Sequence, residues 1–152
     1  MKRLLLFAVA LSVVACTGEI AGLGPPSDPA TETFASSLGV NLTDMTRTPD
    51  GLYYRDLNIG NGAVLAHDTT VTVTYSGYLA DGTLFDSESQ VQFATANLVT
   101  GFREGLIGMH VNGRRQLVIP SDLGYGKAGS PPTIPRQATL VFDVSLVSID
   151  SA

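Results

Sequence analysis

The sequence has little of several residue types on which protein chemistry often depends. It contains no tryptophan, one cysteine and two histidines in 152 residues. A single cysteine excludes a disulfide within the chain. His67 and His110 lie far apart, and neither has a cysteine or carboxylate at ligand spacing, so we predict no metal site.

Basic residues are also scarce. Nine Lys and Arg residues stand against 14 Asp and Glu residues, which gives a formal net charge of −5. This acidic balance provides no electrostatic reason to expect a nucleic-acid partner. The pair Arg114 and Arg115 is too short to reverse it, and we expect this pair in a solvated surface turn.

Motifs for covalent or cofactor chemistry are missing as well. No serine lies in a G-x-S-x-G turn, and no set of nucleophile, base and orienting group is indicated. Residues 124–129 match G-x-G-x-x-G, but a dinucleotide site needs a helix after the motif, and Pro131 and Pro132 block one. We therefore predict a protein without a cofactor.

Residues 1–15 have the pattern of a targeting segment. Lys2 and Arg3 give a positive start, and the apolar run over residues 4–15 is too short to span a bilayer comfortably. Cys16 follows small residues, in a pattern that resembles the lipobox of bacterial lipoproteins. We predict a lipoprotein signal peptide and a lipidated Cys16, which would anchor the protein to the membrane on the periplasmic side of a bacterial envelope. The alternative is an ordinary secretory signal followed by an incidental cysteine.

Residues 16–47 have the composition of a flexible tether. Glycine, proline, serine and threonine are frequent, and such a stretch cannot build a core of its own. Its scattered apolar residues could form a short helix or dock on the domain, and the sequence does not choose between these alternatives. They are Phe34, Leu38, Val40 and Leu42. We place the folded domain at residues 48–152.

The stretch over residues 71–86 predicts the centre of the fold. Its first half alternates apolar and polar residues, which is typical of a half-buried strand. Residues 81–82 are Asp-Gly, a sequence that favours a tight turn. The resulting hairpin would bring Tyr75, Phe85 and Asp86 together, as two aromatic walls and one carboxylate of a small pocket.

The rest of the pattern predicts about five antiparallel strands and one short helix, an α+β fold with the helix across one face of a curved sheet. The helix is expected because Phe102, Leu106 and Met109 recur on one face. We expect residues 87–92 to form a polar connection, and we expect a monomer because no heptad pattern or exposed apolar helix is visible. The other predicted elements are strands over residues 52–59, 114–119 and 139–149, a strand fragment over 93–99, and the helix over 101–108.

Four blocks of sequence resemble the FKBP-type peptidyl-prolyl cis-trans isomerases. They occur in the family's order and extend the resemblance over about residues 50–149. They are YSGYLADGTLFDS at 75–87, GFREGL at 101–106, IPSDLGYG at 119–126 and IPRQATLVFDV at 134–144. The resemblance implies a twisted antiparallel sheet wrapped around one short helix.

The resemblance also implies a binding pocket. Tyr75 and Phe85 match the family's pocket walls, Asp86 its pocket carboxylate, and Phe102 the helix position that is usually tryptophan and forms the pocket floor. The smaller Phe102 implies a deeper floor. Leu98 and Val99 match a pair beside the substrate, and the resemblance implies that the Val99 amide binds a substrate carbonyl. Tyr125 matches a tyrosine that donates to the ligand, and Ile134 and Phe142 match apolar lining residues. Phe93 is carried over as a further substrate contact.

These residue types suit a reaction in which no bond is made. Moving an amide from water into an aromatic cavity should shift the balance toward the twisted state, because water stabilises the planar resonance form. Donors placed for the rotated carbonyl add differential binding. The expected partners are proline-containing unfolded or secreted polypeptides. The alternative hypothesis is a peptide-binding or chaperone module of the same fold with little catalysis.

Overall fold

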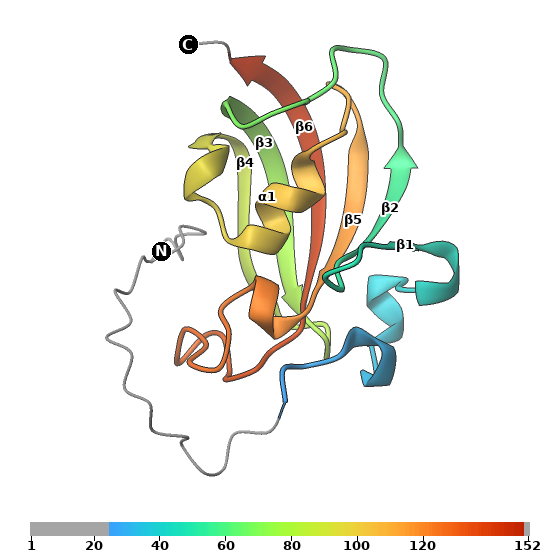
Figure 1. The fold of residues 1–152 in the computed structure, drawn as a ribbon, viewed down its shortest axis with the longest axis vertical. Helices are drawn as coiled ribbons and strands as arrows, with labels where there is room; N and C mark the ends of the chain where they lie inside the picture. The colour runs from blue at the N-terminus through green and yellow to red at the C-terminus, as the bar shows by residue number, and fades with distance from the viewer. Residues whose placement is uncertain (1–24, 151–152) are drawn as a thin grey trace.

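The computed structural model describes residues 25–150 and contains one six-stranded sheet. All neighbouring strands pair antiparallel, in the order β1-β2-β5-β6-β3-β4. A single α-helix of the described chain, α1 (Thr100–Leu106), lies across one face of the sheet (Figure 1). The predicted α+β fold is confirmed, with six strands rather than five. The strands are β1 (Thr46–Arg47), β2 (Tyr53–Asn58), β3 (Thr70–Leu79), β4 (Leu84–Ala94), β5 (Arg114–Ile119) and β6 (Leu140–Asp150).

Strand β3 has the alternating burial that its sequence predicts. Val71, Val73 and Tyr75 are buried, and the residues between them are half-buried. The turn after β3 also forms as expected: Gly82 has a φ of +91°, and the Thr83 amide donates to the Asp81 carboxylate at 2.9 Å. This hairpin places β4 beside β3.

Strand β4 is longer than the sequence suggested. We predicted a polar connection over residues 87–92 and a strand fragment over 93–99, but β4 runs without interruption from Leu84 to Ala94. The prediction was wrong because β4 is an edge strand with one neighbour, so it needs few apolar residues. Residues 95–97 form a 3₁₀ turn, η4 (Thr95–Asn97).

Helix α1 lies unusually close to β5 because two glycines face the sheet. A Cβ atom on Gly101 would lie 2.5 Å from a methyl carbon of Ile119, and one on Gly105 would lie 2.5 Å from a methyl carbon of Leu117. Larger residues at these positions would push the helix away from the sheet. The helix ends two residues earlier than predicted, and the following turn has Gly108 at a φ of +87°.

Arg115 contradicts the prediction of a solvated surface turn. It lies in β5, is only 6% exposed, and forms an ion pair with Asp56 at 2.7 Å. It also donates to the carbonyl oxygens of Gly105 and Ile107, at 3.0 and 3.2 Å. Side chains alternate across a strand, so its neighbour Arg114 is exposed while Arg115 turns inward and caps the end of α1.

The described part of the predicted tether, residues 25–47, is folded against the sheet. It contains three 3₁₀ turns and β1, and its apolar side chains cover a patch on the face opposite α1. Burying this patch offsets the entropy of ordering the segment. The composition of the segment does not show this packing, so the boundary that we placed at residue 48 falls inside the folded region. The side chains are Phe34, Leu38, Val40, Leu42 and Met45, and the patch comprises Tyr53, Val118 and Val141. The turns are η1 (Pro29–Thr31), η2 (Ser36–Leu38) and η3 (Leu42–Asp44).

The predicted signal peptide and Cys16 lie outside the described residues. Over residues 25–150, no helix has the length and apolar character needed to cross a bilayer.

Candidate functional site

Five aromatic rings meet between the sheet and α1. Tyr75 on β3 lies 5.8 Å from Phe102 on α1 and 6.2 Å from Phe142 on β6, measured between ring centroids. Phe102 and Phe142 are 4.9 Å apart in an edge-to-face arrangement. Phe93 lies 6.1 Å from Tyr75, and Phe85 lies 5.5 Å from Phe142. The sequence predicted these five residues for one site, and the structure brings them together from four elements.

The rings differ in how far solvent reaches them. Phe102 and Phe142 are fully buried and Tyr75 is 3% exposed, whereas Phe85 is half-buried. Edge-to-face packing of this kind contributes about 0.5–1.5 kcal/mol per pair beyond the area buried. The cluster is therefore a rigid apolar base with one ring, Phe85, at its solvent side.

Gly77 allows the rings to approach each other, and the sequence reasoning missed it. It lies on β3 two residues after Tyr75, and a Cβ atom here would lie 2.6 Å from a ring carbon of Phe142 and 2.7 Å from one of Phe85. An isolated glycine inside a strand pattern often marks such a close approach, so the sequence did contain a signal.

The polar edge of the cluster is a hydrogen-bonded pair. The Tyr75 hydroxyl donates to the Asp86 carboxylate at 2.7 Å. Burial raises the pKa of Asp86; the bond from Tyr75 lowers it in part, and the charge of Glu88 raises it further. Burial, and then the hydrogen bond to Asp86, raises the pKa of Tyr75, so Tyr75 is the donor at neutral pH. Asp86 thus fixes the orientation of the Tyr75 hydroxyl.

Tyr125 and Ile134 reach the same apolar cluster from the long loop between β5 and β6. Ile134 is fully buried and Tyr125 is half-buried. Burial, and secondarily the charge of Asp86, raises the pKa of Tyr125 to about 12. Tyr125 therefore keeps its proton at neutral pH and presents a hydroxyl within the electrostatic reach of Asp86.

Leu98 and Val99 complete the predicted set. They lie between η4 and α1, and they are 2% and 3% exposed within the same cluster. Val99 is the N-cap of α1, and its carbonyl accepts from the Arg103 amide at 3.0 Å. The amide of an N-cap residue is not used by the helix, so the Val99 N–H is placed at the helix start beside the rings.

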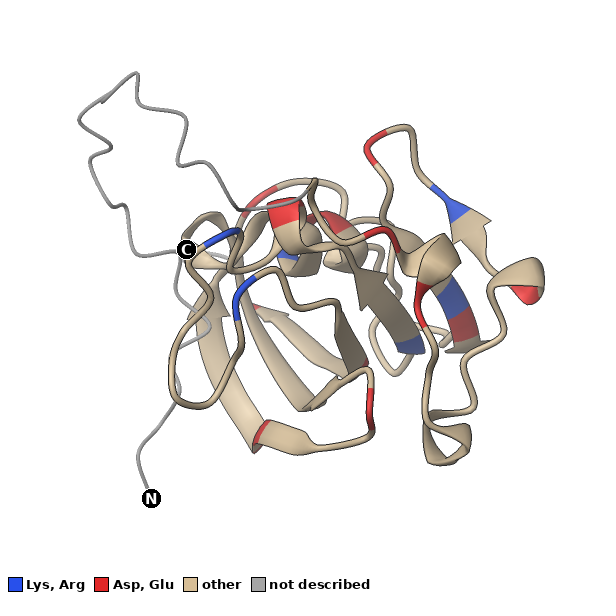
Figure 2. Cartoon of the chain, turned by 90° about the horizontal axis from the view of Figure 1, so that it is seen from below, with Lys and Arg blue, Asp and Glu red and all other residues tan. Residues whose placement is uncertain are grey.

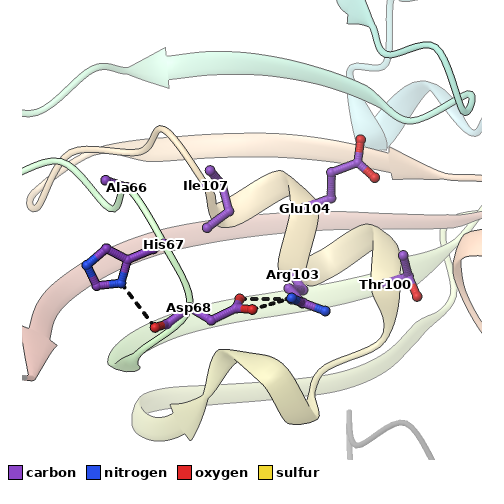
Figure 3. A pocket seen from close by; sticks show the side chains of 7 residues that line it. All are labelled: Ala66, His67, Asp68, Thr100, Arg103, Glu104 and Ile107. Atoms are coloured by element: carbon purple, nitrogen blue, oxygen red, sulfur yellow. Dashed lines mark hydrogen bonds and ion pairs between the residues drawn. The ribbon is translucent and has the colours of Figure 1, made fainter. Parts of the chain in front are cut away.

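A hollow flanks α1 on its charged side. Figure 3 shows Arg103 turned toward Asp68, and the two form a bidentate ion pair. His67 lies against the carbonyl oxygen of Asp68 at 3.1 Å. Arg103 and Asp68 therefore neutralise each other at this hollow. Its other lining residues are Ala66, Thr100, Glu104 and Ile107.

The distribution of charge agrees with the composition. Among the described residues, Figure 2 shows Lys and Arg dispersed over several elements, without a continuous basic stripe of the kind that nucleic-acid backbones require. Among residues 25–150, no group of three or more His, Cys, Asp or Glu residues could hold a metal ion.

Comparison with known proteins gives the class to which this fold and cluster correspond. Residues 62–147 match the family model described as FKBP-type peptidyl-prolyl cis-trans isomerase. The chain is 38% identical over 122 residues to the FKBP-type 22 kDa peptidyl-prolyl cis-trans isomerase of Escherichia coli, with 78% of this chain and 57% of the relative aligned. It is 37% identical over 105 residues to an FK506-binding protein of Neisseria meningitidis, covering 65% of this chain and 96% of that protein.

Solved structures agree with the sequence comparison. A peptidyl-prolyl cis-trans isomerase from Pseudomonas syringae superposes with a TM-score of 0.68 at 28% identity, over 76% of this chain and 87% of that one. FkpA from Escherichia coli gives a TM-score of 0.67 at 38% identity, over 72% and 53% of the two chains. The chain belongs to the FKBP-type peptidyl-prolyl cis-trans isomerase family.

The relatives differ from this chain in length. The alignment covers 29% of FK506-binding protein 4 of Dictyostelium discoideum and 57% of the 22 kDa Escherichia coli protein. The chain therefore spans about a third to just over half the length of most of the first curated relatives that it matches.

Proposed function

We propose that this chain is an active prolyl isomerase that uses the aromatic cluster as its substrate site. The observation that carries the proposal is the convergence of five rings with a hydrogen-bonded Tyr75–Asp86 pair at 2.7 Å and a protonated Tyr125 at one edge. Apolar walls with a few placed donors are the usual composition of a small-ligand site.

The reaction needs no nucleophile. Rotation about a peptide bond is opposed by a resonance barrier of about 18–20 kcal/mol, and an unassisted X-Pro bond isomerises over about tens to hundreds of seconds. Water stabilises the polar planar amide more than the twisted one. A prolyl bond that leaves water for the surface of the rings therefore loses part of the stabilisation that opposes rotation.

Each polar group has a defined part in this proposal. The Val99 amide binds a substrate carbonyl, and the Tyr125 hydroxyl donates to the ligand beside the rotating bond. Asp86 holds the Tyr75 hydroxyl and directs the local field toward the site. Phe85, which is half-buried, closes the solvent side when a prolyl ring occupies the cluster. These interactions accelerate rotation to the extent that they are stronger in the twisted state.

The test is the cis-to-trans conversion of a proline tetrapeptide, with wild type, Asp86→Asn and Asp143→Asn compared. Asp143 is a matched control: it is a half-buried aspartate next to Phe142 on β6, but it pairs with Arg114 and faces away from the rings. We expect Asp86→Asn to lower kcat/KM about tenfold, the equivalent of one hydrogen bond to a charged group, and Asp143→Asn to leave it unchanged.

Two results would contradict the proposal. A wild-type chain no faster than buffer would favour the binding or chaperone module with little catalysis. Equal rates in the wild type and Asp86→Asn would remove Asp86 from the site.

The cellular setting is also a proposal. We infer that the protein assists the folding of extracytoplasmic polypeptides while anchored through a lipid on Cys16, because the N-terminal pattern resembles a lipobox. Metabolic labelling with a radioactive fatty acid tests this inference: the wild type should be labelled and the Cys16→Ser chain should not. Equal labelling, or none in either chain, would contradict it.

A further inference from the structure

The loop between β5 and β6 carries two residues of the proposed site with little regular structure of its own. Within residues 120–139 the structure has one 3₁₀ turn, η5 (Ser121–Leu123), and an isolated bridge between Ser130 and Ile134. A loop of this length tends to open locally unless other parts of the protein hold it. The position of Tyr125 therefore depends on what fixes the two ends of the loop.

Ser27, nearly a hundred positions earlier in the chain, lies against both ends. Its amide donates to the Ser121 hydroxyl oxygen at 2.9 Å, and the Ser121 amide donates back to the Ser27 hydroxyl oxygen at 2.9 Å. The Thr139 hydroxyl also donates to the Ser27 oxygen, again at 2.9 Å. Ser121 opens the loop and Thr139 closes it, so one hydroxyl group joins the two ends. Figure 1 shows the blue start of the described chain beside the orange loop.

Burial makes these bonds hard to replace with water. Ser121 is 1% exposed and Thr139 is 2% exposed. A buried donor that loses its partner retains the full cost of its desolvation. We call these hydrogen bonds of Ser27 to Ser121 and Thr139 the clamp; it joins the two ends of the loop only while the Ser27 hydroxyl is present.

The clamp continues to the residue next to Tyr125. The Gly126 amide donates to the Ser121 carbonyl at 2.7 Å, and the Gln137 amide donates to the Gly126 carbonyl at 3.0 Å. The Gln137 side chain in turn donates to the carbonyl of Pro25 at 3.0 Å. A continuous set of hydrogen bonds thus leads from the N-terminal segment to the backbone at Tyr125.

We propose that Ser27 is a positioning residue for the isomerase site, and that it acts by clamping the loop that presents Tyr125 and Ile134. The inference rests on the proposed function for its effect on rate, but not for its effect on the loop. Because the segment packs outside the aromatic cluster, Ser27 itself touches no substrate.

The experiment compares wild type, Ser27→Ala and Ser36→Ala in the full-length chain. Ser36 is the matched control, because it lies in the same N-terminal segment, is exposed, and its hydroxyl bonds to nothing among residues 25–150. The first readout is hydrogen–deuterium exchange of the Gly126 and Gln137 amides, with the Arg103 amide of α1 as an internal reference. The second readout is kcat/KM with the proline tetrapeptide.

We expect Ser27→Ala to speed exchange at Gly126 and Gln137 at least about tenfold, because two hydrogen bonds to buried partners are lost, while Arg103 exchanges at the wild-type rate. We expect kcat/KM to fall at least about threefold, because a displaced donor weakens transition-state binding. Thr139→Val removes one of these two bonds and should speed exchange at the same two amides by a smaller factor.

Each outcome is decisive. Loop exchange unchanged in both Ser27→Ala and Thr139→Val refutes the clamp. Faster exchange with an unchanged rate in an active enzyme refutes the positioning role. If the wild type is inactive, the proposed function fails, and exchange still shows whether Ser27 holds the loop.

Discussion

The most direct test of the ring cluster is Gly77→Ala. A Cβ atom at this position would lie 2.6 Å from a ring carbon of Phe142 and 2.7 Å from one of Phe85, whereas ordinary contact begins at 3.4 Å. The rings must therefore retreat by 0.8 Å (3.4 minus 2.6) and 0.7 Å (3.4 minus 2.7). Phe142 is fully buried against Phe102 and Tyr75, so it has nowhere to move. We expect the half-buried Phe85 to swing outward instead.

The expected cost follows from overpacking in a dense core. Forcing one extra methyl group into such a site destabilises a domain by about 1–3 kcal/mol. For a domain of this size that corresponds to a fall in Tm of about 3–12 °C. Activity should fall as well, because Phe85 leaves the position from which it closes the site.

The assay is thermal unfolding together with proline-tetrapeptide isomerisation, and Ser76→Ala is the matched control. Ser76 is the neighbouring residue of β3 on the opposite face, so the same alanine is introduced away from the rings. Its Tm and rate should stay near those of the wild type. If Gly77→Ala also unfolds and turns over like the wild type, the reasoning from close approach is refuted.

Two further predictions concern charge. Asp86 has a raised pKa in the folded protein, so its ionisation costs stability as pH rises from below the unfolded pKa through the folded pKa. Asp86→Asn is neutral at every pH, so its free energy of unfolding in urea should rise relative to that of the wild type between pH 3 and pH 7. A difference that stays constant over this range would contradict the prediction. Arg115→Lys keeps the charge but loses the planar group that spans Asp56 and the end of α1, so it should lower stability by about 1–3 kcal/mol. Arg114 is exposed, so Arg114→Lys should change stability by less than about 0.5 kcal/mol. Thermal unfolding of the two variants checks both values, and equal losses of stability in Arg115→Lys and Arg114→Lys would contradict a special role for Arg115.

The local features of the fold were predictable, because they depend on residues close in sequence. The alternation along β3 and the Asp81–Gly82 turn are determined by side chains that are adjacent in the sequence, and both formed as expected. Edge strand β4 was missed because a strand with one neighbour and one solvated side needs little apolar sequence.

Features that depend on distant partners could not be predicted in this way. The ion pair of Arg115 joins residues 59 positions apart, and the hydrogen bonds of Ser27 reach 94 and 112 positions along the chain. Nothing in the neighbourhood of either residue distinguishes it from an ordinary surface arginine or serine. The hairpin pattern indicated Tyr75 and Phe85. The other three ring residues, Phe93, Phe102 and Phe142, were named only because four blocks of sequence resemble a family.

The strand order has a consequence for how the protein comes into being. Strand β6 lies between β5 and β3, so it joins the group β1-β2-β5 to the pair β3-β4, and it supplies Phe142. A nascent chain that lacks β6 has two groups of strands that no strand joins, and pairings of such long sequence separation form slowly. The ring cluster can therefore form only after the ribosome has released β6, and a truncation inside β6 prevents it from forming.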